Sequence, residues 1–459
     1  MAEQREQLAS RLGFILLSAG CAIGLGNVWR FPFITGRFGG AAFVLIYILF
    51  LLIFGLPIMV MEFSIGRASQ QNIGLALKTL EPKGTKWHIY GPIAIAGNYI
   101  LMMFYTVVSG WLLAYFYGMV VGDFTNLSPE AVGGHFGGML GNPAMMTFWM
   151  IVATLLGLGI VGMGLQKGVE RITKYMMTAL FVIMLILVIK SVSLPGASEG
   201  LKFYLLPNWS RLSENGIWQA IYAAMGQAFF TLSLGIGSMA IFGSYIGKER
   251  SLTGESISII GLDTLAALLS GLIIFPAAFA FNVSPDAGPS LIFITLPNIF
   301  NAMQGGRVWG TLFFVFMSFA ALSTLVAVFE NIISYWIDVK QWSRQKAVTV
   351  NIIAIIILSM PCVLGFNLLA GFQPLGPGSG VLDLEDLIVS TTLLPLGSLV
   401  FLLFCCSKRG WGWKNFLAEA DTGKGIKFPA WSRVYVTYIL PVLVLFVFIM
   451  GYLDIFVLK

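Results

Sequence analysis

Five residues carry side-chain oxygen atoms in stretches of chain that are otherwise apolar. Hard cations such as sodium take oxygen ligands, and inside lipid these come only from carbonyls, hydroxyls, amides and carboxylates. A single Ser or Thr in such a stretch more often hydrogen-bonds to its own helix, so only the combination predicts a cation site. The five residues are Asn27, Thr231, Asp263, Ser323 and Thr324.

Asp263 is the most informative of these residues, because it is the one charged residue between positions 256 and 285. A carboxylate in an apolar membrane segment is costly and usually functional. The alternatives are an internal salt bridge or an acid that keeps its proton.

Two of the apolar stretches are interrupted by paired glycines, at 24–26 (GLG) and 235–237 (GIG). Glycine costs about 1 kcal/mol relative to alanine inside a helix. One such pair alone is equally well explained by close helix packing. Matched interruptions in two halves of a chain, however, point to the central site of a transporter, where unwound backbone frees carbonyls for a cation and half-helix N-termini face an anionic group.

The composition requires a lipid bilayer around the elements that position these residues. Of 459 residues, 58% are hydrophobic and 10% charged, whereas soluble chains are about 25% charged. Disorder, collagen, coiled coils and secreted disulfide scaffolds are excluded, and no nucleic-acid partner is expected. The four cysteines all lie in apolar stretches and suggest no disulfide framework.

Hydropathy and length predict an all-α membrane protein with about 11 transmembrane helices. The helices are expected near 11–36, 41–68, 88–122, 145–164, 168–190, 217–246, 252–283, 307–338, 345–364, 383–407 and 434–456. A cytoplasmic N-terminus places most of the 27 Lys and Arg residues inside, as the positive-inside rule requires. The cell membrane is then the location, with Lys459 outside. The polar opening residues lack a signal peptide, and 285–307 is expected to form an external, partly helical loop.

Three segments resemble the neurotransmitter:sodium symporter family, in its prokaryotic amino-acid transporter branch. They are residues 11–32, which include GCAIGLGNVWRFP, residues 229–237 (FFTLSLGIG) and residues 320–324 (AALST). The resemblance implies a LeuT-like fold in one transporter domain, 1–459. Its two inverted five-helix repeats would be 11–190 and 217–407, with broken first and sixth helices and an additional helix at 434–456.

The resemblance also implies two sodium sites and a substrate site between them, with no organic cofactor. The first sodium site would use the carbonyls of Ala22 and Thr231 and the side chains of Asn27, Thr231 and Asp263. The second would use the carbonyls of Gly20, Ile23 and Ala320 and the hydroxyls of Ser323 and Thr324. The substrate residues would be Cys21, Ala22, Gly24, Leu25, Gly26, Leu101, Tyr105, Phe230, Thr231, Ser233, Ile236, Thr324 and Val328.

The substrate class follows from two features of this expected site. Relatives that carry monoamines have an acid where Gly24 stands, so an α-amino acid that brings its own carboxylate is expected, held by the Tyr105 hydroxyl. Leu101, Ile236 and Val328 make the side-chain pocket apolar, which favours an aliphatic or aromatic substrate.

The resemblance assigns two gates as well. Arg30 and Asp386 would close the outer side with Phe230. Arg5 and Asp338 would close the inner side with Ser244 and Tyr245, although solvated surface charges are an equal interpretation of that pair. For Glu62 and Glu330, internal hydrogen bonding is expected.

Two departures from the family pattern bear on mechanism. Chloride-dependent members carry a hydroxyl four residues after a seventh-span Asn, and here the pair is Asp263 and Ala267; a fixed carboxylate would make transport chloride-independent. Some members have a Pro ten residues after Gly168, where this chain has Thr178.

The predicted function is sodium-coupled symport by alternating access. The alternatives are an ion channel and a membrane-embedded enzyme. The enzyme is disfavoured because two histidines are too few for a metal-ligand cluster.

Overall fold

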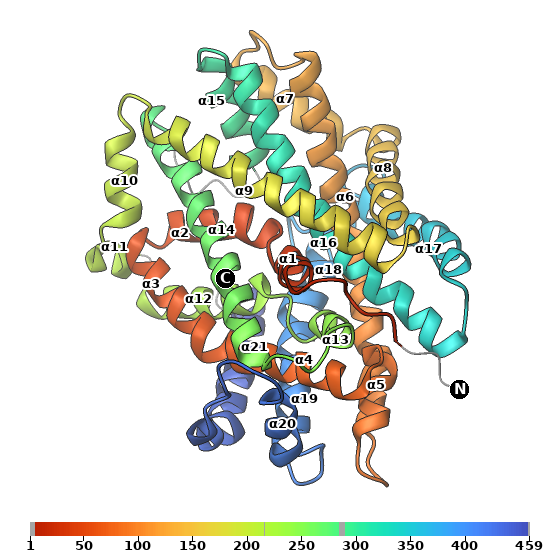
Figure 1. Ribbon diagram of the computed structural model, residues 1–459. Coiled ribbons are helices and arrows are strands. Elements are labelled where there is room, and N and C mark those ends of the chain that lie inside the picture. Colours follow the sequence, from red (N-terminus) through yellow and green to blue (C-terminus); the bar gives the residue numbers. More distant parts are fainter. Residues whose placement is uncertain (1–4, 215, 284–289, 458–459) are drawn as a thin grey trace.

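The computed structural model describes residues 5–214, 216–283 and 290–457, and within them the chain is helical, with one isolated bridge between Arg250 and Lys424. The helices pack side by side around a buried centre (Figure 1). The all-α prediction is therefore confirmed.

Within the described residues, nine helical segments are long and apolar enough to cross a membrane. They are Ala41–Ser69 (α3, η2 and α4), Trp87–Val121 (η3 and α6), Pro143–Gly162 (α8), Leu165–Val192 (η4 and α9), Leu252–Ala280 (α14), Gly306–Lys340 (α16), Arg344–Gly365 (α17), Val381–Cys406 (α18, η6 and α19) and Ala430–Phe456 (η7, η8 and α21). Shorter helices connect them, among them α5 (Ile73–Leu80), α7 (Pro129–Leu140), α10 (Ala197–Leu205) and α20 (Trp413–Ala420).

The first span is a broken one. It consists of α1 (Arg11–Ala22) followed by η1 (Gly26–Arg30) and α2 (Phe31–Arg37), and the two parts are bent by 54°. The break lies at the predicted glycine pair, because α1 ends at Ala22 and Ile23 adopts an extended ψ of 90°.

The sixth span, predicted as 217–246, is likewise two helices, α12 (Ile217–Thr231) and α13 (Ser238–Gly243). Between them Gly235 and Gly237 take φ angles of 106° and 79°, which glycine adopts without the strain a side chain would bring. A Cβ atom at Gly235 would also lie 2.2 Å from the carbonyl oxygen of Leu394. The glycines therefore serve both the local turn and the close approach of α19.

Burial separates a central group of helices from a peripheral one. The apolar window of α16 is 83% buried inside the protein and that of the α6 span 78%, whereas only 22% of the α21 window is buried. Because exposed apolar faces need lipid, α21 lies at the lipid-facing edge. At the centre, α1 and α13 of the two broken spans pack against α16, and Leu25 at the first break bonds to Tyr105 of α6.

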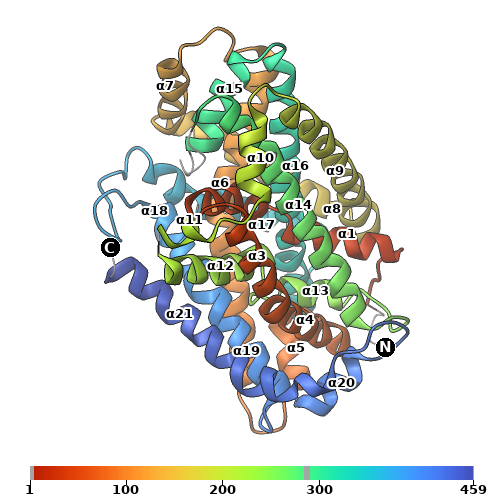
Figure 2. The ribbon, with the colours of Figure 1, turned by 90° about the vertical axis from the view of Figure 1, so that its left-hand side faces the viewer.

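The two ends of the molecule are defined by short helices (Figure 2). One end carries α7 and α15 (Leu296–Ala302), and the opposite end carries α5 and α20. We call them the outer and the inner end, following the predicted orientation. Helix α15 lies in the predicted external loop; the first residues of that loop and Lys459 lie outside the described residues.

Candidate functional site

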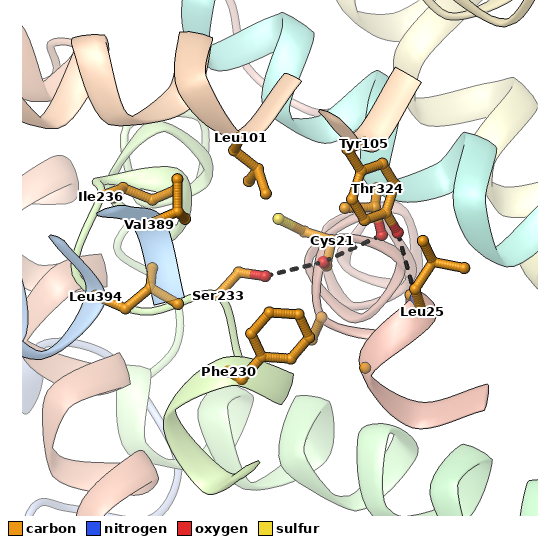
Figure 3. A pocket seen from close by; sticks show the side chains of 13 residues that line it. Cys21, Leu25, Leu101, Tyr105, Phe230, Ser233, Ile236, Thr324, Val389 and Leu394 are labelled. Atoms are coloured by element: carbon orange, nitrogen blue, oxygen red, sulfur yellow. Dashed lines mark hydrogen bonds between the residues drawn. The ribbon is translucent and has the colours of Figure 1, made fainter. Parts of the chain in front are cut away.

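A small pocket lies where the two broken spans face α6, α16 and the tenth span, Val381–Cys406 (Figure 3). Its volume is about 30 Å³, room for one or two water molecules, so a larger ligand enters only when the walls move apart. Its lining residues are Cys21, Ala22, Gly24, Leu25, Gly26, Leu101, Tyr105, Phe230, Ser233, Ile236, Thr324, Val389 and Leu394.

The pocket agrees closely with the expected substrate residues. All of them line it except Thr231, whose hydroxyl turns to Asp263, and Val328, which is fully buried in α16. Val389 and Leu394 line the pocket but were missed. The functional roles of all these residues remain predictions.

The pocket has a polar end and an apolar end. Figure 3 shows Tyr105 and Thr324 presenting their hydroxyls beside Leu25, while Ile236, Val389 and Leu394 lie on the opposite side. The backbone N–H of Leu25 donates to the Tyr105 hydroxyl at 3.3 Å. Donors at one end and hydrocarbon at the other suit a ligand with an anionic head and an apolar tail.

Backbone at the polar end comes unusually close to the hydroxyls. A Cβ atom at Gly24 would lie 2.6 Å from both the Thr324 Oγ1 and the Tyr105 hydroxyl oxygen. Glycine is therefore required there for space, and the space lies where an anionic head would meet both hydroxyls.

Asn27, Thr231 and Asp263 meet beside the first break, and each is at most 1% exposed. The Asp263 carboxylate accepts from the Asn27 amide at 2.8 Å and from the Thr231 hydroxyl at 3.2 Å. Carboxylate, hydroxyl and amide are the oxygen donors that a hard cation takes. The structure thus brings together the side chains of the first predicted sodium site.

A second group of oxygens lies between α1 and α16. The Thr324 hydroxyl is 3.3 Å from the carbonyl oxygen of Gly20 and 3.4 Å from that of Ala320, and the Ser323 hydroxyl donates to Ala320 at 2.9 Å. Since α1 ends at Ala22, the Ile23 N–H still donates to Ala19, but the Gly24 N–H turns to the Asn27 side chain and leaves the Gly20 carbonyl free to accept from elsewhere. The break therefore creates the acceptors that the second predicted sodium site needs.

Glu62 supports the unwound part of the sixth span. Its carboxylate accepts from the backbone N–H groups of Gly235 at 3.1 Å and Met239 at 3.2 Å. Glu330 accepts from the Tyr245 hydroxyl at 2.7 Å and from Arg344 at 2.6 Å. Both acids are hydrogen-bonded internally, as expected.

The predicted outer-gate residues do not form an ion pair in the part of the chain that the structure describes. The Arg30 guanidinium lies 4.4 Å from the centre of the Phe230 ring, a cation–π geometry. Asp386 instead accepts a hydrogen bond from Ser390, one turn further along the tenth span.

The predicted inner-gate residues do meet. Arg5 forms an ion pair with Asp338, and their side chains are 14% and 10% exposed. The Arg5 guanidinium also lies 4.8 Å from the Tyr245 ring centre. Ser244 bonds within its own turn, to the carbonyl of Ile241. Because both side chains are largely buried, a packed ion pair explains this contact better than two solvated surface charges.

Glu170 adds a contact on this inner side that sequence reasoning missed. It ends the π-helix η4 (Leu165–Glu170) and is 5% exposed. Its carboxylate accepts from the backbone N–H groups of Ala9 at 2.7 Å and Ser10 at 3.1 Å, and from the Ser10 hydroxyl at 2.8 Å. Ser10 in turn caps α1 through Gly13. The fifth span thereby holds the start of the first.

We expect Glu170→Gln to loosen this hold, because the amide lacks the charge that strengthens these hydrogen bonds. Losing one charge-assisted contact costs about 1.5–3 kcal/mol, so Cys21 should react roughly 10-fold faster or more with a water-soluble maleimide in sodium-free detergent. The other three cysteines would be replaced by alanine. Glu199→Gln, on the exposed surface of α10, is the matched control, and equal rates in both variants would contradict the prediction.

Comparison with known proteins places this geometry in context. Residues 5–127 and 135–457 match the family model described as the Sodium:neurotransmitter symporter family. The chain is 35% identical over 454 residues to the uncharacterized sodium-dependent transporter YhdH of Bacillus subtilis, covering 98% of each chain. It is 27% identical to the sodium-dependent serotonin transporter of Drosophila melanogaster, covering 98% of this chain and 77% of that one. The crystal structure of MhsT in complex with L-phenylalanine is similar with a TM-score of 0.86 and 38% identity, over 97% of this chain and 100% of that chain.

Proposed function

Because the chain belongs to the sodium:neurotransmitter symporter family, we propose that it imports a hydrophobic α-amino acid together with sodium ions, independently of chloride. It is a membrane transporter and not an enzyme. The observation that carries the proposal is the two-ended pocket, with hydroxyls at one end and apolar side chains at the other.

The amino-acid substrate is supported by what the pocket contains. Gly24 leaves the polar end without an acid, so a bare amine would have no counter-charge, whereas a zwitterion brings its own carboxylate to the Tyr105 and Thr324 hydroxyls. The apolar end favours an aliphatic or aromatic side chain. MhsT, 38% identical to this chain, was solved with L-phenylalanine.

Chloride independence is supported by Asp263. Its carboxylate lies fully buried beside Asn27 and Thr231. A fixed negative charge there balances a sodium ion without a mobile anion.

The mechanism we propose is alternating access: two sodium ions and the substrate bind a central site that is open outward, the outer gate shuts, and the inner side then opens. A membrane potential supplies about 2.3 kcal/mol per charge per 100 mV, and a tenfold gradient about 1.4 kcal/mol. Two sodium ions then provide roughly 7 kcal/mol, enough to concentrate a neutral amino acid about 10⁵-fold.

The test is uptake of a labelled amino-acid mixture into proteoliposomes made with this protein. We expect hydrophobic amino acids to accumulate only when sodium is higher outside, and to accumulate equally when gluconate replaces chloride. Empty liposomes are the control. Accumulation that is indifferent to the sodium gradient would refute the coupling, and a loss of uptake in gluconate would refute chloride independence.

A further inference from the structure

We propose that Val389 and Leu394, from the tenth span, are specificity-determining residues that set the size of the substrate's side chain. This inference rests on the proposed amino-acid substrate. Both residues line the pocket, and they are 1% and 3% exposed.

A π-helical turn is what brings both side chains to the pocket. The tenth span changes from α18 (Val381–Asp386) to the π-helix η6 (Leu387–Leu393) and then to α19 (Leu394–Cys406). The N–H of Leu394 donates to the carbonyl of Val389, five residues earlier. Residues five apart lie on different faces of an α-helix, where neighbours are three or four apart. One wider turn brings them toward the same side.

We call Val389 and Leu394 the wall of the pocket. The backbone behind this wall packs against the unwound part of the sixth span. A Cβ atom at Gly397 would lie 2.0 Å from the carbonyl oxygen of Gly235. The Tyr90 hydroxyl donates to Gly235 at 2.8 Å and is 3.4 Å from the carbonyl oxygen of Leu393. Because the two backbones touch, the tenth span is packed directly against the unwound sixth span, and the Val389 and Leu394 side chains limit the space on this side of the pocket.

The position of the wall gives it this role. In Figure 3, Val389 lies next to Ile236, and both lie across the pocket from Tyr105 and Thr324. An amino acid whose carboxylate lies at those hydroxyls therefore directs its side chain toward Val389 and Leu394. One methylene more or less in such a pocket changes discrimination about 10- to 200-fold.

The experiment compares uptake of leucine and tryptophan from one mixture in proteoliposomes with a sodium gradient. We expect Val389→Ala and Leu394→Ala each to raise the tryptophan-to-leucine ratio about 10-fold, and Val389→Leu to lower it by a similar factor. Leu403→Ala is the matched control: this residue lies in the same helix α19 but is 38% exposed at the outside of the molecule, and the ratio should not change.

The outcomes separate this inference from the proposed function. If the unaltered protein takes up no amino acid under a sodium gradient, the proposed function fails first. If it does, and the ratio stays the same in all three wall variants, the inference is overturned. Opposite shifts in Val389→Ala and Val389→Leu support it, because a loss of folding lowers the uptake of both amino acids together.

Discussion

Replacing Gly24 by alanine is expected to reduce sodium-driven amino-acid uptake at least about 100-fold. The added methyl carbon would lie 2.6 Å from two hydroxyl oxygens, those of Thr324 and Tyr105, and the space it takes is the space proposed for the substrate carboxylate. Overpacking alone costs about 1–3 kcal/mol, and a displaced carboxylate loses its hydrogen bonds as well. Substrate affinity, measured by binding of a labelled amino acid in detergent, should fall with uptake.

The control for this prediction is Gly159→Ala in α8, where an added Cβ atom meets no atom within 4 Å. That variant should transport normally and unfold at the same temperature as the unaltered protein. Transport by Gly24→Ala at more than a tenth of the normal rate would show that the carboxylate does not bind at these hydroxyls.

Asp263→Asn is expected to weaken sodium-dependent transport roughly 100- to 1,000-fold. The side chain is fully buried and its carboxylate is the acidic member of the first predicted sodium site. Removing one partner of a buried charge pair costs about 3–5 kcal/mol, and here the partner would be the transported ion. The measurement is the sodium concentration that gives half-maximal uptake, which should rise steeply.

A second substitution makes this prediction specific. Ala267 lies four residues after Asp263 on α14 and is fully buried, so the double variant Asp263→Asn with Ala267→Ser reproduces the asparagine and hydroxyl of chloride-dependent relatives. We expect it to recover uptake in part, and only when chloride is present. Equal uptake by this double variant in chloride and gluconate would refute the idea that the Asp263 carboxylate takes the place of an anion.

The sequence predicted the breaks in the first and sixth spans because their cause is local. Paired glycines tolerate an unwound backbone, and the structure places both breaks where those pairs stand. The family motifs placed most of the pocket for the same reason, since most of the lining comes from two short contiguous segments, residues 21–26 of the first span and 230–236 of the sixth.

The missed residues depend on features that no periodic pattern reveals. Val389 and Leu394 share the pocket only because a π-turn alters the helical period, so an α-helical register puts them on different faces. Glu170 caps a helix that begins about 160 residues earlier in the chain, and a carboxylate near a helix end gives no sign of so distant a partner. The outer-gate pairing, Arg30 with Asp386, is absent from the described conformation and stays a prediction.

Thr324 is shared by the proposed substrate site and the second predicted sodium site. Its hydroxyl faces the pocket and also lies within 3.4 Å of the carbonyl oxygens of Gly20 and Ala320. In the proposed mechanism this single oxygen atom would contact both the amino acid and the ion, so a change that one ligand causes at the atom would alter the binding of the other. Thermodynamic linkage makes this effect reciprocal. If an amino acid raises the affinity for sodium by some factor, sodium raises the affinity for that amino acid by the same factor. Ranking amino acids by how strongly they raise sodium affinity would therefore rank them by how strongly sodium raises their own affinity.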